Sequence, residues 1–339
     1  MSPTPAVELD VDGQIVKLSN PDKVFFSTRG ETKLDLVNYY LAVGNGALLG
    51  VRHRPTVMKR YPNGAEGEPF FQKRVPPHAP DWIPRCEIAF PSGRTADELC
   101  PSHISHIIWA VNLGCLDLNP WAVRSTDVDH PDELRIDLDP QPGLPFESVR
   151  RTAMLVKDVL DEHRLTGYPK TSGSRGIHVN IRIDPQWDFL QVRRAALALG
   201  REVERRAPDL VTTKWWKEER GNRVFIDYNQ NARDRTVASA YSVRANPQAK
   251  VSCPLTWDEV ADVEPEDLTI ATVPSRYAKL GDIGAGIDNT AFSLDSLLEL
   301  SQRDEKEGLG DAPWPPNFAK QAGEAKRVAP SRAKKPKND

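Results

Sequence analysis

The chain has 339 residues, enough for one large domain or two ordinary ones, and 39% of them are hydrophobic, as expected of a globular protein. The formal net charge is only −3, so overall charge gives no reason to expect a nucleic-acid-binding protein, and any basic surface must be local. The four cysteines are too widely spaced for a zinc or disulfide motif, and neither a signal peptide nor an apolar run of membrane-spanning length is evident, so we expect a cytoplasmic protein.

The first predicted elements are a hairpin and a helix. Residues 7–18 alternate like two strands joined at Asp12-Gly13, a dipeptide that favours tight hairpin turns. Asn20, or the serine before it, can cap a following helix, and Lys17 and Lys23 would then flank its positively polarised end. Such an end can bind an anion, but two lysines beside a cap are more often ordinary surface residues.

The next segments combine aromatic and basic residues. Residues 32–49 predict a second helix, and residues 56–61 a strand with Lys59 near its end. Phe70 and Phe71 are followed by two cations, a composition used to stack bases and neutralise phosphates. Considered alone, a pair of phenylalanines is more often part of a hydrophobic core.

Two carboxylates lie on one face of a predicted strand at residues 134–140. Side chains alternate in a strand, so the leucine and isoleucine side chains face a core while Asp137 and Asp139 point the other way, side by side. Their mutual repulsion favours a bound cation, and hard carboxylate oxygens suit Mg²⁺ or Mn²⁺. An exposed edge strand with two solvated acids is the alternative.

A small basic loop and an alternating strand follow an amphipathic helix predicted at residues 147–165. In residues 170–183, the loop is rich in glycine and serine, and the strand buries four branched apolar side chains on one face. Loop amides together with Ser172, Arg175 and His178 can converge on phosphate oxygens. A serine and glycine turn before a strand is also common without any ligand.

The rest of the predicted fold supplies a third acid. Residues 189–206 repeat the amphipathic helical stripe, and Asp227 follows a short apolar strand on the face opposite its buried side chains. Residues 237–243 predict a further strand leading to Arg244, and residues 251–257 a last short one.

The periodic pattern fades near residue 300. Residues 320–339 hold seven Lys or Arg and two acidic residues, with a net charge of +5. We therefore expect one catalytic domain over residues 1–300, with an N-terminal α/β part to about 125 and a metal-site part over about 126–300. Residues 301–339 should form a basic, disordered tail.

Together these motifs predict phosphoryl chemistry. Two acids on one strand and a third on another can hold two divalent ions, and the loop between them in sequence can hold a polyphosphate. This combination favours nucleotidyl transfer. A two-metal nuclease or phosphatase acting on nucleic acid is the alternative, and a non-catalytic DNA-binding adaptor is a third possibility.

Three sequence runs carry a resemblance to a known family. They are Lys-Thr-Ser-Gly-Ser-Arg-Gly-Ile-His-Val at 170–179, Phe-Ile-Asp-Tyr-Asn-Gln-Asn at 225–231 and Tyr-Ser-Val-Arg-Ala at 241–245. With Asp137-Leu138-Asp139, they resemble the motifs of the archaeo-eukaryotic primase superfamily and, over roughly residues 10–300, the polymerase domain of bacterial ligase D. The resemblance implies an α+β fold in which two abutting mixed sheets, one like the RNA-recognition fold, are flanked by helices around a catalytic cleft.

The resemblance also implies residue roles. Asp137 and Asp139 would bridge two metal ions, Mn²⁺ or Mg²⁺, and Asp227 would complete the ion that activates the primer 3′ hydroxyl. An incoming NTP or dNTP, with ribonucleotides preferred, would be bound by Ser172, Arg175, His178, Lys59, Gln230, Arg244, Phe70 and Phe71. Lys17, Asn20 and Lys23 would bind the DNA 5′ phosphate across a gap or break. These roles differ from the interpretation based on the residues alone, which assigned the two phenylalanines to the hydrophobic core and Lys17 and Lys23 to the ordinary surface.

The implied activity is template-dependent filling of short gaps in DNA repair, in excision repair or end joining. The chain contains no Lys-x-Asp-Gly ligase motif, so it resembles the stand-alone paralogues called primase-polymerase C, and we expect a separate ATP-dependent ligase to seal the product. A monomer near the nucleoid is expected, with an end-binding protein as a further partner. Asn119 replaces a histidine usual in ligase D polymerase domains, which leaves one phosphate contact in question.

Overall fold

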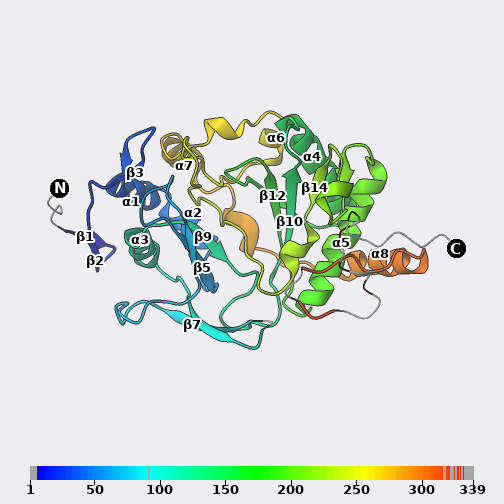
Figure 1. Ribbon diagram of the computed structural model, residues 1–339, viewed down its shortest axis with the longest axis horizontal. Coiled ribbons are helices and arrows are strands. Elements are labelled where there is room, and N and C mark those ends of the chain that lie inside the picture. The colour runs from blue at the N-terminus through cyan, green and yellow to red at the C-terminus, as the bar shows by residue number, and fades with distance from the viewer. Residues whose placement is uncertain are drawn as a thin grey trace.

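The structure, a computed structural model, describes residues 6–90, 92–315, 318–320, 324, 327, 329 and 331. The predicted N-terminal hairpin is confirmed, with β1 (Val7–Val11) paired antiparallel to β2 (Gln14–Leu18). Asp12 and Gly13 form its turn with positive φ angles of 50° and 85°, as a tight hairpin requires. Figure 1 shows this hairpin at one end of the molecule.

The helix predicted after the hairpin is wrong. Residues 19–23 form turns, with Asn20 in the left-handed region at φ 48°, and then continue into β3 (Val24–Phe26), which pairs with β4 (Glu31–Thr32). The backbone oxygens of residues 21 and 23 accept hydrogen bonds from the first residues of the next helix. The segment therefore caps a helix that begins ten residues later.

The helix predicted at residues 32–49 is divided in two. Its parts are α1 (Lys33–Ala42) and α2 (Gly44–Leu49), and they meet at Val43. A Cβ added at Gly46 would lie 2.5 Å from a ring carbon of Tyr241, so the glycine allows α2 to lie close to that ring. This tertiary contact is not visible in local sequence.

The first sheet carries Lys59 and the two phenylalanines. Its strand order is β6-β5-β8-β7, with β9 also paired to β5, and all of its described pairings are antiparallel. The strands are β5 (Thr56–Arg60), β6 (Phe70–Gln72), β7 (Arg85–Ala89), β8 (Thr95–Leu99) and β9 (Cys115–Pro120). Helix α3 (Ile104–Asn112) precedes β9 and is almost entirely buried.

The second sheet carries the acids. Its order is β11-β12-β10-β14-β13, and the β13–β14 pair is parallel while the others are antiparallel. The strands are β10 (Glu133–Pro140), β11 (Tyr168–Thr171), β12 (Ile177–Arg182), β13 (Val211–Thr212) and β14 (Val224–Ile226).

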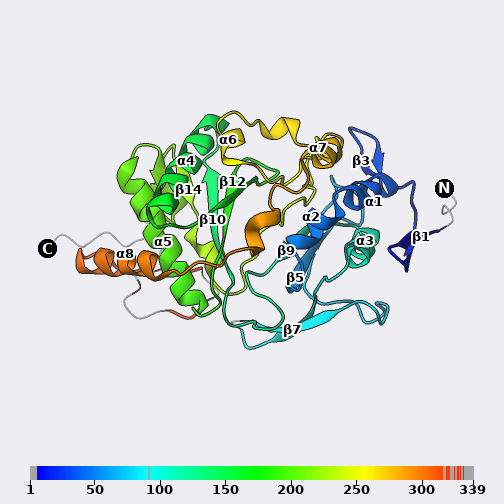
Figure 2. The same ribbon diagram turned by 180° about the vertical axis from the view of Figure 1, so that it is seen from behind.

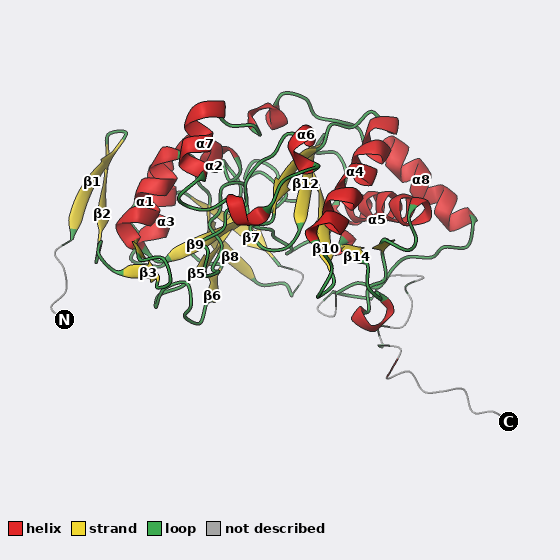
Figure 3. Cartoon of the chain, turned by 90° about the horizontal axis from the view of Figure 1, so that it is seen from above, coloured by secondary structure: helices red, strands yellow, loops and turns green. Residues whose placement is uncertain are grey.

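The predicted amphipathic helices cover one face of this second sheet. Helices α4 (Phe146–Glu162) and α5 (Phe189–Arg206) bury their apolar stripes together with the even-numbered side chains of β10. In Figure 3 they lie with α8 (Asp295–Lys306) at the end of the molecule opposite β1 and β2. The odd-numbered side chains of β10 therefore face the first sheet.

The strands predicted at residues 237–243 and 251–257 are wrong. The backbone of these two segments is irregular. Among the described residues, the β-type pairing between the two segments is a single isolated bridge that joins Val243 to Val251. Tyr241 has a positive φ of 62°, which a regular strand does not allow. The remaining helices are α6 (Trp257–Val260) and α7 (Val273–Leu280), with short 3-10 turns η1 (Lys217–Glu219), η2 (Tyr228–Asn231), η3 (Pro265–Asp267) and η4 (Ala285–Asp288).

The packed part of the chain continues past the boundary predicted at residue 300. Helix α8 (Asp295–Lys306) crosses that boundary and lies beside α5 (Figure 2). Beyond α8, Trp314 is buried against Arg193, and the guanidinium carbon of Arg193 lies 3.9 Å from the centroid of the Trp314 ring. The prediction of a disordered tail from residue 301 is therefore wrong as far as Trp314. Most of the basic segment 320–339 lies outside the described residues, so the prediction is not tested there.

The two sheets abut, and the α+β architecture is confirmed. Arg135 of β10 is fully buried and donates hydrogen bonds to the carbonyl oxygens of Pro120 and Trp121 at the end of β9. Among the described residues, every helix is too short or too polar to span a lipid bilayer.

Candidate active site

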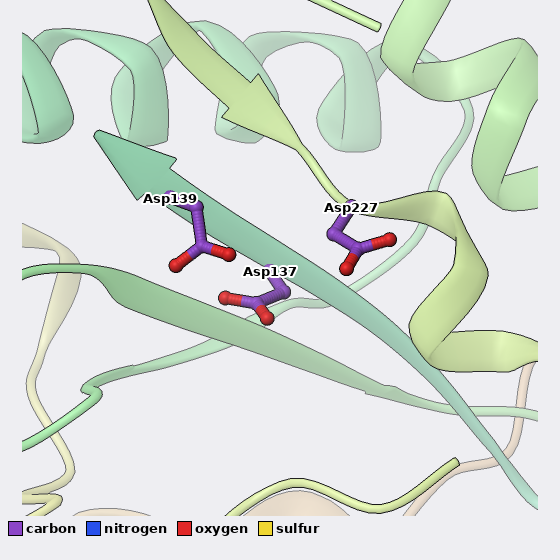
Figure 4. A group of neighbouring side chains, drawn as sticks. All are labelled: Asp137, Asp139 and Asp227. Carbon is purple, nitrogen blue, oxygen red and sulfur yellow. The ribbon is translucent and has the colours of Figure 1, made fainter. Parts of the chain in front are cut away.

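The three predicted acids lie together. Asp137 and Asp139 project from β10, and Asp227 follows β14, the neighbouring strand (Figure 4). One carboxylate oxygen from each acid can be chosen so that all three lie within 4.8 Å of one another. Asp137 is buried, Asp227 is half-buried and Asp139 is exposed, so the cluster opens toward solvent on one side.

Backbone pairing and a glutamine amide position these acids. The Asp227 amide donates to the Asp137 carbonyl oxygen at 2.9 Å, which extends the β10–β14 pairing to the acids themselves. The Asp227 carboxylate accepts from the Asn229 amide and so caps η2. Gln230 Nε2, one turn later, donates to Asp137 Oδ2 at 3.1 Å.

The electrostatics of the cluster fit a bound cation. Although part of the Asp139 side chain is exposed, loss of water around its carboxylate, and then the charge of Asp137, raise its pKa to about 7; burial and then Asp137 raise the pKa of Asp227 to about 7. Burial also opposes ionisation of Asp137, but His178, Lys170 and the Gln230 amide hold its pKa below the usual range. Among the described residues, the buried oxygen Asp137 Oδ1 has no hydrogen-bond partner. Three hard oxygen donors with an unpartnered buried oxygen suit a divalent metal ion.

The predicted phosphate loop lies against the acids. Ser172 Oγ accepts hydrogen bonds from the amides of Ser174 and Gly176, which holds the loop in a tight curve. A Cβ at Gly176 would lie 2.4 Å from the carbonyl oxygen of Leu138, so glycine is required for the loop to approach β10 this closely. Arg175 extends from the same loop and is exposed.

His178 connects the loop strand to the acids. It lies opposite Asp137 in the β10–β12 register, and its Nε2 is 3.3 Å from Asp137 Oδ1. Burial and then the neighbouring Lys170 lower the pKa of His178 to about 4, so the ring is neutral at neutral pH. The pKa of Lys170 is itself lowered to about 7, first by burial and then by Arg244.

A cationic group from elsewhere in the fold completes the cleft. Lys59 Nζ lies 3.7 Å and Arg244 Nε lies 3.4 Å from the carboxylate of Asp117, on β9. Burial raises the pKa of Asp117, and Arg244 and then Lys59 oppose that shift. Asn119, two residues along β9, also lines the cleft and donates from its side chain to the backbone oxygen of Asp117.

The two phenylalanines are exposed, so the core interpretation is wrong for both. Phe70 is 44% and Phe71 is 60% exposed. Lys59 Nζ lies 5.5 Å from the Phe71 ring centroid, and Arg60 lies over Phe70. Phe71 lines the cleft beside the acids, whereas Phe70 lies outside the set of described residues that line it.

One cleft thus gathers most of the predicted nucleotide-site residues. Its lining includes Lys59, Phe71, Asp137, Asp139, Ser172, Arg175, His178, Gln230 and Arg244. These side chains come from strands of both sheets, from the loop between β11 and β12, from η2 and from the irregular segment between Val237 and Val251. Asp117 was not identified from the sequence. Residues two apart in a strand point to the same face, so Asp117 could have been identified from Asn119, for which a phosphate contact was already considered.

The predicted 5′-phosphate residues lie apart from this cleft, and the described residues that line it do not include them. Lys17 is exposed on β2, Asn20 is in the turn after it, and the Lys23 ammonium donates to the Pro62 carbonyl oxygen. The helix end proposed to orient them does not exist, so any anion site here would depend on the lysines themselves. Lys33 is a further buried cation nearby: burial and then Lys23 lower its pKa to about 8.

Comparisons with known proteins agree with this geometry. Residues 32–283 match the family described as "LigD, primase-polymerase domain". The chain is 32% identical over 292 residues to the multifunctional non-homologous end joining protein LigD of Mycolicibacterium smegmatis, covering 85% of this chain and 38% of that protein. It is 30% identical over 268 residues to the bifunctional LigD of Bacillus subtilis, covering 78% of this chain and 43% of that protein.

A solved structure gives the same result. The polymerase domain of Mycobacterium tuberculosis ligase D in complex with DNA matches with a TM-score of 0.76 and 30% identity, over 82% of this chain and 99% of that chain. The chain thus spans less than half of the length of these two LigD proteins but covers 99% of the solved M. tuberculosis polymerase domain. It belongs to the LigD primase-polymerase domain family, and like that domain it is a nucleotidyltransferase.

Proposed function

We propose that the chain adds single nucleotides to a primer 3′ end opposite a template base and so fills short gaps during DNA repair. Ribonucleotides are the preferred substrates, and deoxynucleotides are also used. The observation that carries the proposal is a cluster of three acids, two of which, Asp137 and Asp139, line one cleft together with a serine, arginine and histidine loop. A site that bound only phosphates would be weakened by buried acids, so their presence favours metal-assisted transfer.

The acids are the proposed metal ligands. Asp137 and Asp139 would hold two ions, and Asp227 would complete one of them. When bound, such ions supply charge stabilisation for the attacking oxygen and the leaving pyrophosphate. We propose Mn²⁺ as the physiological ion, with Mg²⁺ as a substitute, because both accept carboxylate oxygen ligands.

The remaining cleft residues would bind the nucleotide. The Ser172 hydroxyl, the Arg175 guanidinium and the His178 ring would contact the triphosphate, and Lys59 and Arg244 would add positive charge from the other side. Phe71 would stack on a base, with Phe70 next to it, since exposed aromatic rings beside cations suit nucleic acid. Gln230 would keep Asp137 oriented, as its hydrogen bond to that carboxylate suggests.

The proposed polynucleotide substrate is gapped or broken duplex DNA with a 5′ phosphate. The LigD polymerase domain of known structure was solved with DNA, which supports DNA as the ligand here. Lys17, Asn20 and Lys23 would contact the 5′ phosphate on the far side of the gap. A separate ATP-dependent ligase would then seal the nick, and an end-binding protein would assist at double-strand breaks.

The test uses duplex DNA with a one-nucleotide gap, with and without the 5′ phosphate, and supplies NTPs and dNTPs separately with Mn²⁺. We expect templated addition of one nucleotide, faster with NTPs and with the phosphate. Omitting nucleotides provides the decisive control, because a two-metal nuclease would still shorten the strands. Strand shortening, or untemplated addition at equal rates, would reject the proposal.

A further inference from the structure

Lys170 is a buried cation next to the cleft that the proposed function does not use. It lies on β11 directly opposite His178 on β12, and it is 3% exposed. Its ammonium lies 2.7 Å from His178 Nδ1, whereas the other ring nitrogen, Nε2, is on the side of the acids. A lysine in this position can control which nitrogen of the ring carries a proton.

The neighbouring hydrogen bonds determine what Lys170 does. Its Nζ is 2.8 Å from the Ala238 carbonyl oxygen, which can only accept. It is also 2.8 Å from Ser252 Oγ, whose own hydrogen is donated to the Thr171 carbonyl oxygen at 2.8 Å. The serine oxygen therefore accepts from the lysine. An ammonium has three hydrogens and no lone pair, so the third hydrogen points to His178 Nδ1.

His178 Nδ1 must then be unprotonated, because it accepts this hydrogen bond. A neutral imidazole carries its single hydrogen on the nitrogen that does not accept. That nitrogen is Nε2, 3.3 Å from Asp137 Oδ1. In the opposite tautomer, a lone pair on Nε2 would face a carboxylate and, in the cleft, the negatively charged phosphates.

We propose that Lys170 is a positioning residue that holds His178 in the tautomer protonated at Nε2, so that an N–H, and not a lone pair, faces the side of the cleft where the acids and the nucleotide phosphates lie. The tautomer assignment rests on these contacts and on Lys170 being in its ammonium form. Its consequence for nucleotide binding rests on the proposed function.

The direct test is nitrogen NMR of the full chain labelled with ¹⁵N-histidine, at neutral pH and without metal or nucleotide. The chain has seven histidines, so the signals of His178 are assigned by their loss in His178→Gln. We expect an unprotonated Nδ1 and a protonated Nε2. A ring protonated at Nδ1, as a neutral lysine amine would require, or protonated at both nitrogens, would overturn the proposal.

Variants separate the lysine's role from its packing. Lys170→Met removes the donor, and we expect the Nε2-protonated form to lose its dominance. Lys170→Gln keeps an N–H donor and should retain that form at least in part. Ser252→Ala removes a neighbour of Lys170 but not the lysine's hydrogen bond to the ring, so the tautomer should be unchanged. If Lys170→Met folds and leaves the tautomer unaltered, the positioning role is refuted; if it does not fold, the wild-type and Lys170→Gln spectra still decide.

Kinetics on gapped DNA provide the second measurement. Loss of the directed N–H should raise the KM for the nucleotide about tenfold in Lys170→Met, with a smaller change in kcat and partial recovery in Lys170→Gln. An altered tautomer without any kinetic effect would refute the role in nucleotide binding while leaving the tautomer assignment intact. Absence of polymerase activity in the wild type would instead reject the proposed function, and the NMR result would remain valid.

Discussion

The two sides of the cleft are built in different ways. The acidic side, Asp137, Asp139 and Asp227, lies on adjacent strands of one sheet, and regular backbone pairing places its carboxylates. The cationic side consists of Lys59, from strand β5, and Arg244, from an irregular segment. Both pair with the same buried carboxylate, that of Asp117. Side chains positioned by strand register can be predicted from alternation, whereas side chains positioned by a shared tertiary partner cannot.

The largest effect should come from the acidic side. Asp137→Asn or Asp227→Asn should lower nucleotide addition on gapped DNA by about 10³-fold or more, because each removes a charged ligand of ions worth several kcal/mol to the transition state. Asp161→Asn, which changes an exposed aspartate of α4 paired with Lys157, is the matched control and should be neutral. Retention of near-normal addition by both site variants would refute the metal assignment.

The cationic side should have a smaller effect, concentrated in substrate affinity. Arg244→Ala should raise the KM for the nucleotide about 10- to 100-fold, since a charge-assisted hydrogen bond to phosphate contributes roughly 1.5–3 kcal/mol. Steady-state kinetics would show kcat less affected. Arg150→Ala removes a partly exposed arginine of α4 that pairs with Glu264 and serves as the control. An equal loss in both variants would indicate a general effect on the fold.

Phe71 should contribute less again. Phe71→Ala should weaken nucleotide or template binding about tenfold, consistent with roughly 1–3 kcal/mol for stacking on one base. Phe70→Ala is the comparison, because Phe70 is next in sequence but lies over Arg60 and outside the cleft lining. Binding of a fluorescent nucleotide to each variant measures the difference. A larger loss for Phe70 than for Phe71 would reverse the assignment.

The N-terminal lysines should have the smallest effect on catalysis. The double variant Lys17→Ala and Lys23→Ala should reduce the stimulation by a 5′ phosphate a few-fold and lessen its salt dependence, because Lys17 is exposed and Lys23 is only half-buried, so both would contribute through screened contacts. Addition to DNA lacking the phosphate should not change. Lys157→Ala is the control. Undiminished sensitivity to the phosphate would show that it binds elsewhere.

A buried acid of the first sheet provides a contrast in stability. Burial raises the pKa of Glu98 to about 8, although the Trp121 N–H donates to it, and no described acid joins it in a metal-binding group. Its folded pKa exceeds the unfolded value, so the folded state keeps the proton and loses stability as pH rises from about 4.5 through about 8. Glu98→Gln should therefore gain stability over wild type by about 1–3 kcal/mol at pH 9 but little at pH 5, as thermal unfolding would measure. A difference independent of pH would contradict this.

Sequence patterns predicted the acidic side because its elements obey simple periodicities. Strict alternation in β10 and β12 and the helical stripe of α5 correspond to the observed elements, and the α5 bounds agree to the residue. The residues alone predicted Asp227 as a third metal-holding acid, and the motif resemblance added a nucleotide-stacking role for Phe71, which local reasoning had assigned to the core; both roles remain predictions. These predictions depended only on near neighbours in sequence.

The failures share a cause in long-range contacts. Asn20 adopts a left-handed conformation, and the turn that follows it caps α1 through the oxygens of Pro21 and Lys23, whereas the local sequence resembles the cap of an immediate helix. The segment from Val237 to Val243 has strand-forming residues, but its backbone bonds to distant partners, as when the Ser239 amide donates to the Leu118 oxygen. Asp117 was missed because a lone aspartate has no significance until two distant cations approach it.

If three acids and a phosphate loop form one nucleotide-metal site, metal binding should depend on both. The number of Mn²⁺ ions bound by the full chain can be determined by electron paramagnetic resonance with and without a non-hydrolysable ribonucleoside triphosphate. We expect two protein-bound ions in wild type when the nucleotide is present, and loss of at least one in Asp227→Asn. Equal Mn²⁺ binding by wild type and Asp227→Asn, unaffected by the nucleotide, would contradict it.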